Sequence, residues 1–169
     1  MRSRSPVLIV LLTLAAPAVA RAGETACWFE NGAVVAPAVI ADMAGDYVID
    51  LSAPVTLLHE TTAQMGGYAD TDLTLPVRLA GQRVAAAPVA VRDLDYRSVG
   101  FVTPIAGVIG ADILTRFVVS LDFAPCRLRL DPLGGPIRPK GRALAVTMVH
   151  GLPTVLAAAA RGDSGLSGA

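Results

Sequence analysis

Asp50 is the residue of this sequence best placed to do chemistry, because it follows directly on a short apolar run. Tyr47-Val48-Ile49 is typical of a buried strand, and Asp50-Leu51-Ser52-Ala53-Pro54 continues it with residues typical of a turn. A carboxylate at the end of a buried strand can have a perturbed pKa and act as a general acid or base. An aspartate there can equally be a turn former that bonds its own backbone. The position alone leaves both interpretations open.

Other residue types that often carry chemistry occur without the spacing that their chemistry needs. His59 and His150 are far apart and have no partner at metal-ligand spacing, so we expect no metal site, and no motif indicates a cofactor. Asp112 is expected to cap or flank a short helix. Trp28 and Phe29 are expected to cover the core beside Cys27.

The first 22 residues have the pattern of a cleaved secretory signal. Arg2 and Arg4 precede an uncharged apolar run from Pro6 to Val19, and small residues follow up to Ala22. A retained anchor is the alternative, but the run is shorter than the roughly 20 residues that cross a bilayer. We therefore expect a periplasmic or secreted chain that begins at Gly23, without stable membrane insertion.

Charge and cysteine content are consistent with an exported protein that does not bind nucleic acid. The whole chain has 14 basic and 14 acidic residues, and removal of the signal with its three Arg leaves 11 against 14. No basic stripe indicates a nucleic-acid partner. Cys27 and Cys126 are the two cysteines, and an oxidising compartment favours a disulfide between them. Two separate buried thiols are the alternative, since sequence cannot show that the two residues come within bonding range.

The spacing of Gly and Pro between short apolar runs predicts an all-β domain over residues 23–133. A hairpin turn is expected at Ala80-Gly81-Gln82 and one short helix at Ala111 to Arg116. Residues 134–169 are expected to form a linker that is largely disordered. The expected strands are Val34 to Asp42, Tyr47 to Asp50, Leu73 to Leu79, Arg83 to Arg92, Phe117 to Asp122 and Arg127 to Leu130.

Two motifs resemble those of the retropepsin-like and pepsin-like aspartic proteases, in the order and at the spacing of that family. The first runs from Val48 to Leu58 and reads apolar-apolar-Asp-x-x-Ala-x-x-Thr-x-Leu. The second, Ala106 to Phe117, resembles the apolar-apolar-Gly segment behind the active-site loop and the short helix after it. The strand pair that follows is similar to the end of the small bacterial, exported members. The resemblance implies a closed or partly open β-barrel with one short helix.

The resemblance also implies a reaction and a partner. In this family two aspartates share a proton and activate a water for hydrolysis of a peptide bond. This chain has one candidate loop, so the catalytic Asp50 would need a second copy in a homodimer, acting on a peptide or protein substrate. No cofactor is implied.

The active-site loop, which comprises Leu51, Ser52 and Ala53 after Asp50, departs from the family at two of these positions. Leu51 stands where the family has Thr, whose hydroxyl bonds across to the opposite loop, and Ser52 stands where it has Gly. Unpaired buried partners cost about 1–3 kcal/mol each, which could slow catalysis by orders of magnitude. A catalytically inactive pseudo-protease that binds a peptide or protein is therefore the alternative. Met65-Gly66-Gly67-Tyr68 is either the remnant of a substrate-covering flap or an ordinary loop.

The C-terminal segment contains a weak internal repeat of an earlier segment. Pro153-Thr154-Val155-Leu156-Ala157 is similar to Pro37-Ala38-Val39-Ile40-Ala41. This repeat is interpreted as the start of a truncated second lobe, with chance similarity among Ala and Val residues as the alternative.

Overall fold

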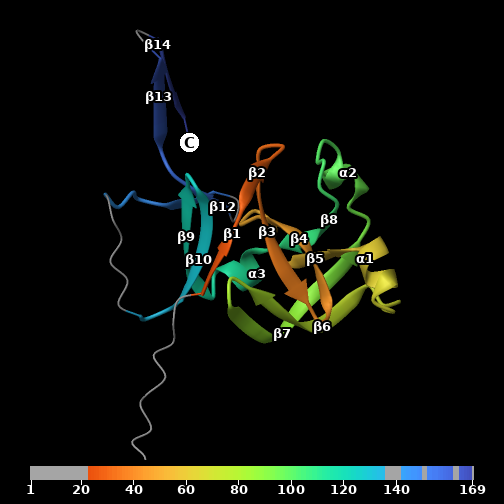
Figure 1. Ribbon diagram of the computed structural model, residues 1–169. Helices are drawn as coiled ribbons and strands as arrows, with labels where there is room; N and C mark the ends of the chain where they lie inside the picture. The colour runs from red at the N-terminus through yellow and green to blue at the C-terminus, as the bar shows by residue number, and fades with distance from the viewer. Residues whose placement is uncertain (1–22, 136–141, 150–151, 162–163, 169) are drawn as a thin grey trace, which may run out of the picture.

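The body of the protein is a closed β-barrel (Figure 1). The computed structural model describes residues 23–135, 142–149, 152–161 and 164–168. The helices are α1 (Glu60–Met65), α2 (Asp95–Ser98) and α3 (Ala111–Leu114). The strands are β1 (Gly23–Ala26), β2 (Trp28–Glu30), β3 (Ala33–Ile40), β4 (Met43–Ile49), β5 (Thr56–His59), β6 (Asp72–Leu79), β7 (Gln82–Arg92), β8 (Ile105–Ile109), β9 (Phe117–Phe123), β10 (Cys126–Pro132), β11 (Thr147–Val149), β12 (Leu152–Thr154), β13 (Ala157–Arg161) and β14 (Ser164–Gly168).

Six strands close the barrel in the order β3-β4-β8-β5-β7-β6, and β6 returns to pair with β3. The closing register places Ala38 opposite Leu79 and Ile40 opposite Val77. Two of the pairings are parallel, β4 with β8 and β5 with β7, and the others are antiparallel. β2 adds a seventh strand beside β3. The all-β fold class predicted from the sequence is confirmed.

The barrel interior is filled by apolar side chains from alternate positions of the strands, as the period of two requires. Ile40, Tyr47 and Leu58 have no exposed surface. The hydroxyl of Tyr47 donates to the carbonyl oxygen of Met43 at 3.0 Å, which satisfies this buried polar group. Burial raises the pKa of Tyr47, so the phenol stays protonated and the core carries no charge there.

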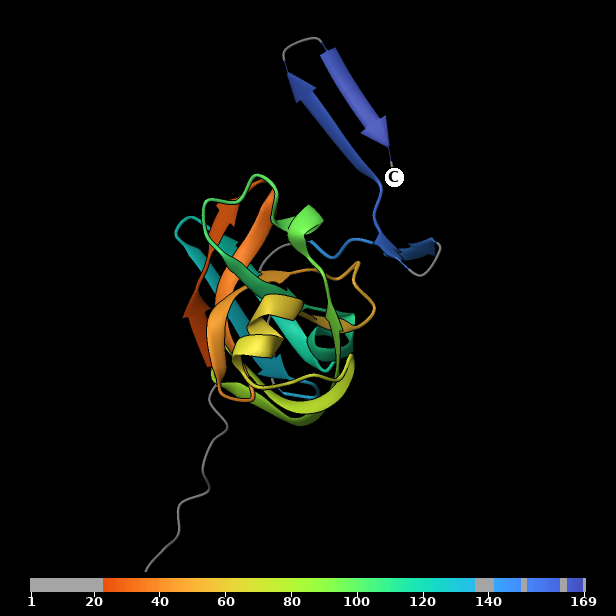
Figure 2. The same cartoon turned by 90° about the vertical axis from the view of Figure 1, so that its right-hand side faces the viewer.

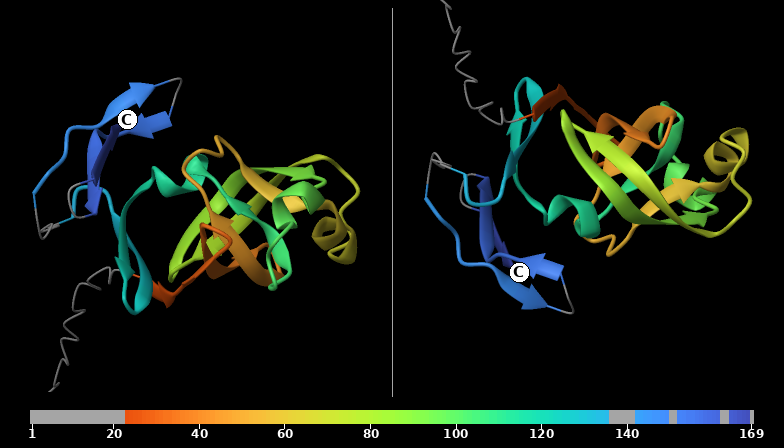
Figure 3. Two further views of the ribbon diagram at one scale, coloured as in Figure 1. Left: turned by 90° about the horizontal axis from the view of Figure 1, so that it is seen from above. Right: turned by 90° about the horizontal axis from the view of Figure 1, so that it is seen from below.

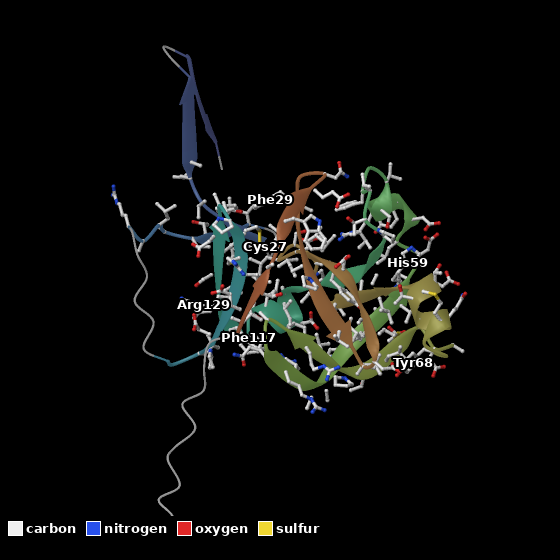
Figure 4. The ribbon with its side chains drawn as sticks, viewed as in Figure 1. Cys27, Phe29, His59, Tyr68, Phe117 and Arg129 are labelled. Carbon is white, nitrogen blue, oxygen red and sulfur yellow. A yellow bond between two sulfur atoms is a disulfide. The ribbon has the colours of Figure 1, made fainter. Side chains whose placement is uncertain are left out.

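A separate antiparallel sheet, in the order β1-β10-β9, lies on the side of the barrel opposite α1 (Figures 1 and 3). A disulfide joins Cys27, directly after β1, to Cys126, the first residue of β10, and their Cα atoms are 5.0 Å apart. The pairing that the sequence left open is therefore formed. Beside it the rings of Phe29 and Phe123 stack with centroids 5.2 Å apart, and Figure 4 shows Phe29 next to Cys27. Phe29 is 48% exposed, so it covers the core less than expected.

Two hairpin turns show how local sequence sets the register. Ala80 and Gly81 both have positive φ, the geometry of a two-residue turn whose twist suits flanking strands. This is the turn expected between β6 and β7. Asn31 and Gly32 form a second turn of the same kind between β2 and β3. The sequence analysis did not predict this second turn.

The expected strands correspond to β3, β4, β6, β7, β9 and β10, with ends shifted by up to four residues. The expected strand from Val34 ends at Ile40, because Ala41 has positive φ and begins the turn to β4. The expected helix corresponds to α3, while α1 and α2 were not predicted. Both are short, and six or fewer residues are too few to show a 3.6-residue period.

Residues of the expected C-terminal linker that the structure describes form two hairpins, β11-β12 and β13-β14. Each pairs within itself, and β13-β14 points away from the barrel (Figure 2). The expected signal peptide lies outside the described residues. In the described part of the chain, no helix is both long and apolar enough to cross a membrane.

Candidate functional site around Asp50

Asp50 begins a loop that is fixed by backbone hydrogen bonds to the end of β8 and the start of α3. The backbone N–H of Asp50 donates to the carbonyl oxygen of Ile109 at 3.1 Å, which continues the parallel pairing of β4 with β8. The carbonyl oxygen of Ala53 accepts from the N–H of Ala111 at 2.8 Å. Ala53 itself is 2% exposed. The two sequence motifs therefore meet in space, as the resemblance implied.

Thr56 ties the far end of this loop to α3. Its hydroxyl donates to Oδ1 of Asp112 at 2.8 Å and accepts from the N–H of Gly110 at 3.1 Å. Thr56 has no exposed surface, so both bonds are shielded from water. Asp112 lies in the first turn of α3 and accepts from Thr56, while Gly110 is the N-cap residue. A Cβ on Gly110 would lie 2.7–2.8 Å from backbone atoms of Ala53 and Val55, so glycine permits this close approach.

Both carboxylate oxygens of Asp50 already have donors within the chain. Oδ1 accepts from the backbone N–H of Ser52 at 2.8 Å and from its hydroxyl at 2.5 Å. Oδ2 accepts from a guanidinium nitrogen of Arg97 at 3.1 Å. The Asp50 side chain is 22% exposed and that of Arg97 is 35% exposed. The carboxylate is thus the acceptor of a local turn and one member of an ion pair.

These donors set the protonation state of Asp50. Partial burial acts to raise the pKa of Asp50, but the hydrogen bonds from Ser52 and the charge of Arg97 outweigh it. The net result is a pKa below the ordinary value, because hydrogen bonds and a nearby cation favour the charged form. In a pair of aspartates that share a proton, one of the two carboxyls instead has a raised pKa. The site in a single chain therefore holds an ionised aspartate.

Leu51 and Ser52 do not make the contacts that the sequence resemblance implies for their positions. The Leu51 side chain is 46% exposed and cannot donate or accept a hydrogen bond. The hydroxyl of Ser52 is directed back to Asp50 of its own loop. At position 51 the loop therefore has no side chain that could donate a hydrogen bond to a second copy of the chain.

Arg97 reaches Asp50 from the strap, which is defined as residues 93–104 between β7 and β8 and includes α2. The tip of the β2–β3 hairpin holds the strap from the other side. Asn31 donates its side-chain amide to the carbonyl oxygen of Val99 at 2.9 Å. One carboxylate oxygen of Glu30 accepts from the backbone N–H groups of Val102 and Thr103. The bond from the Thr103 N–H is the main cause that lowers the pKa of Glu30.

A cavity of about 240 Å³ lies between Asp50 and the strap. Its polar lining is the Asp50–Arg97 pair and Asn31, and the rest is apolar: Ala33, Val48, Leu94, Phe101, Ile105 and Val108. The volume is below the range of about 300–1,000 Å³ that holds drug-sized ligands. The cavity is suited to one apolar side chain rather than to a complete small molecule.

His59, Asp93 and Asp95 form a group that sequence reasoning did not find. One ligand atom from each lies within 4.8 Å of the others, and Nε2 of His59 is 3.1 Å from Oδ1 of Asp95. Figure 4 places His59 where α1 begins. However, Nδ1 of His59 accepts from the backbone N–H of Thr61 and caps α1. A neutral ring with Nδ1 as acceptor carries its proton on Nε2, which is then unavailable to a metal.

The segment considered as a flap remnant does not cover Asp50. Met65 is the last residue of α1, and Gly66 and Gly67 form the turn after it, rather than the tip of a hairpin. Together with Val91 and Arg92 this segment lines a separate depression of about 630 Å³. Asp50 is not among the residues that line this depression.

The structure therefore gathers Asp50, Leu51, Ser52 and Ala53 in one loop at the end of a barrel strand, as the motif predicted. Arg97, Asn31 and Glu30 were not predicted from the sequence. No motif surrounds Arg97, and it lies 47 positions after Asp50 in the sequence, so no local pattern predicts their ion pair. The pair Asn31-Gly32 is typical of a hairpin turn, so the sequence could have predicted the hairpin that carries Glu30 and Asn31.

Six strands close the barrel, and the Asp50 loop lies at the end of one of them, β4, as the sequence resemblance implied. A retropepsin-like aspartic protease from Rickettsia conorii is similar, with 19% identity over 65% of this chain and 90% of that one, and a TM-score of 0.48. The retroviral protease-like domain of Ddi1 from Leishmania major is similar with 19% identity over 63% of this chain and 98% of that domain, and a TM-score of 0.41. No protein-family model and no curated protein matches the sequence.

Proposed function

We propose that this protein is an exported, retropepsin-like module that binds a peptide or an unfolded protein segment beside Asp50 without cleaving it. The observation that carries the proposal is the engagement of both Asp50 oxygens, by Ser52 and by Arg97, within one chain. Peptide hydrolysis by an aspartate pair needs one carboxyl that holds a proton. An ion-paired carboxylate with a lowered pKa holds none at neutral pH.

The adjoining cavity supports binding. Its apolar wall would take a hydrophobic side chain. At its edge the opposite charges of Asp50 and Arg97 compensate each other, so the net charge there is zero. An uncharged, apolar residue of an extended peptide fits this combination. The signal-like N-terminal 22 residues and the disulfide are the grounds for placing the protein in the periplasm or outside the cell.

A homodimeric aspartic peptidase is the second candidate, and one observation favours it. The Asp50 loop is held by backbone bonds to Ile109 and Ala111, so its carboxylate is presented at a fixed position at the end of β4. A second copy could then bring another Asp50 to it. Arg97 would have to leave the carboxylate first.

The test is a cleavage assay with the protein that begins at Gly23. Reduced and alkylated serum albumin would be incubated with it from about pH 3 to pH 7, and fragments would be identified by mass spectrometry. We expect the same background with the protein and with Asp50→Asn. Fragments made by the protein but not by Asp50→Asn would establish the peptidase and refute the non-cleaving function.

Binding is tested separately, on an array of extended peptides. We expect retained peptides to share a bulky apolar residue, and Phe101→Ala to weaken retention because Phe101 lines the cavity. Val102→Ala is the matched control, since Val102 is 95% exposed and is not part of the lining. Equal loss with both variants, or no retained peptide at all, would refute binding at this cavity.

A further inference from the structure

The strap is attached to the barrel in two different ways along its length. Leu94 is 1% exposed and packs with Ala53 and Val108, so this end is fixed in the apolar interior. At its other end the strap runs into β8, a barrel strand. Between these ends the strap places large apolar side chains in solvent: Tyr96 is 70% exposed, Val99 73% and Val102 95%. The middle of the strap therefore gains little from apolar packing.

Polar contacts hold this middle section in place, and all of them lie at exposed or half-exposed positions. They are the Arg97–Asp50 ion pair, the bond from Asn31 to Val99, the bonds from Val102 and Thr103 to Glu30, and the His59–Asp95 pair. Contacts of this kind are individually weak in water. Segments held by few apolar contacts can open while the rest of a domain stays folded.

Closure of the strap affects the Asp50 site in two ways. Leu94, Arg97 and Phe101 form one wall of the Asp50 cavity, so the closed strap covers one side of it. The same closure puts a guanidinium group on Oδ2 of Asp50, where a second carboxyl or a ligand would otherwise approach. Opening would uncover the cavity and leave Asp50 with Ser52 as its donor.

We propose that the strap is a hinged cover of the Asp50 site, that the Arg97–Asp50 pair is its latch, and that Glu30 holds its outer end shut. The site is partly covered in the resting chain, where the Asp50 side chain is 22% exposed. Entry of a peptide, or approach of a second copy, follows release of the latch. The inference concerns access alone, so it stands or falls independently of whether the site binds or cleaves peptides.

The test measures access with a thiol placed in the cavity wall. Val48 lines the cavity on β4, and Val48→Cys introduces a thiol that is the sole reactive one while Cys27 and Cys126 stay joined. The rate of alkylation by iodoacetamide is compared with and without Arg97→Gln. We expect Arg97→Gln to raise the rate by up to about fivefold, the factor given by loss of one partly exposed ion pair. Arg78→Gln is the matched control, because Arg78 is exposed on β6 away from the strap.

Hydrogen exchange provides a second readout without the added thiol. We expect Glu30→Ala to speed exchange at the amides of Val102 and Thr103, and Arg97→Gln to speed it along the strap, with β8 amides unchanged. Circular dichroism and the intact disulfide verify folding. If Arg97→Gln, Glu30→Ala and the double variant all keep the parent's alkylation and exchange rates, the hinged cover is refuted. Faster exchange throughout the barrel would refute it as well, because the whole domain would then be opening.

Discussion

At position 50 the two interpretations of the sequence turn out to coexist. The side chain of Asp50 accepts from the backbone N–H of Ser52, two residues on, which is the local bond expected of a turn former. It is also partly buried beside a cavity, which is the setting expected of a chemical group. The sequence predicted the loop because a short motif specifies it. Arg97 could not be predicted, since its contact depends on how a twelve-residue connection folds back.

The lowered pKa of Asp50 gives its contribution to stability a definite pH dependence. In the unfolded chain the carboxyl has its ordinary pKa of 3.8, and in the folded chain the pKa is lower. The folded state therefore binds the proton less readily than the unfolded one. The stabilisation is fully present above the ordinary pKa and is lost as the pH falls through the lowered value.

We predict that Asp50→Asn lowers the free energy of unfolding by up to about 1 kcal/mol at pH 7, the range for a partly exposed ion pair. The difference from the unmodified protein should shrink as the pH is taken below about 4. Urea denaturation at about pH 7 and about pH 3 measures both values. Arg97→Gln should reproduce the same shrinkage, because it removes the same pair. A difference that stays constant over this range would show that the ion pair does not stabilise the fold.

At the scale of elements, strands were predicted where the apolar pattern is long enough to be recognised. The long strands β3, β6 and β7 were found because Val, Leu and Ala runs lie between clear turns. β2 has three residues and β5 has four, which is too short for alternation to show. β8 was recognised as an apolar segment behind the loop, but its parallel pairing with β4 is a long-range contact that no local pattern encodes.

The connection between β5 and α3 depends on one hydroxyl. Thr56 satisfies the Gly110 N–H and one oxygen of Asp112 in a place without solvent. We predict that Thr56→Val lowers the free energy of unfolding by about 1–3 kcal/mol, because the partners are left unpaired while the volume is kept. Thr56→Ser, which retains the hydroxyl, should lose much less. Equal loss in the two variants, measured by urea denaturation, would show that the hydroxyl contributes no more to stability than the γ-methyl group, which would contradict the prediction.

For the whole molecule, the sequence predicted an all-β barrel but left open how the ends of the domain are joined. Cys27 and Cys126 are 99 residues apart, and the sequence could not show that they meet. They meet because β1 pairs with β10 in a sheet outside the barrel, with Gly23 opposite Leu130. Leu128 and Leu130 of β10 are buried in the same apolar core as the barrel strands. The disulfide adds a covalent connection between the start and the end of the folded domain.

A cross-link that closes so long a loop removes much conformational freedom from the unfolded chain. We predict that replacing both cysteines by alanine lowers the free energy of unfolding by about 2–5 kcal/mol. Urea denaturation of the oxidised protein, of the same protein with dithiothreitol and of the double alanine variant measures the effect. The reduced protein and the alanine variant should agree, because both lose the same constraint. A loss below about 1 kcal/mol would show that the barrel, and not the cross-link, determines the stability of the domain, and it would remove one of the grounds for placing this protein in an oxidising compartment.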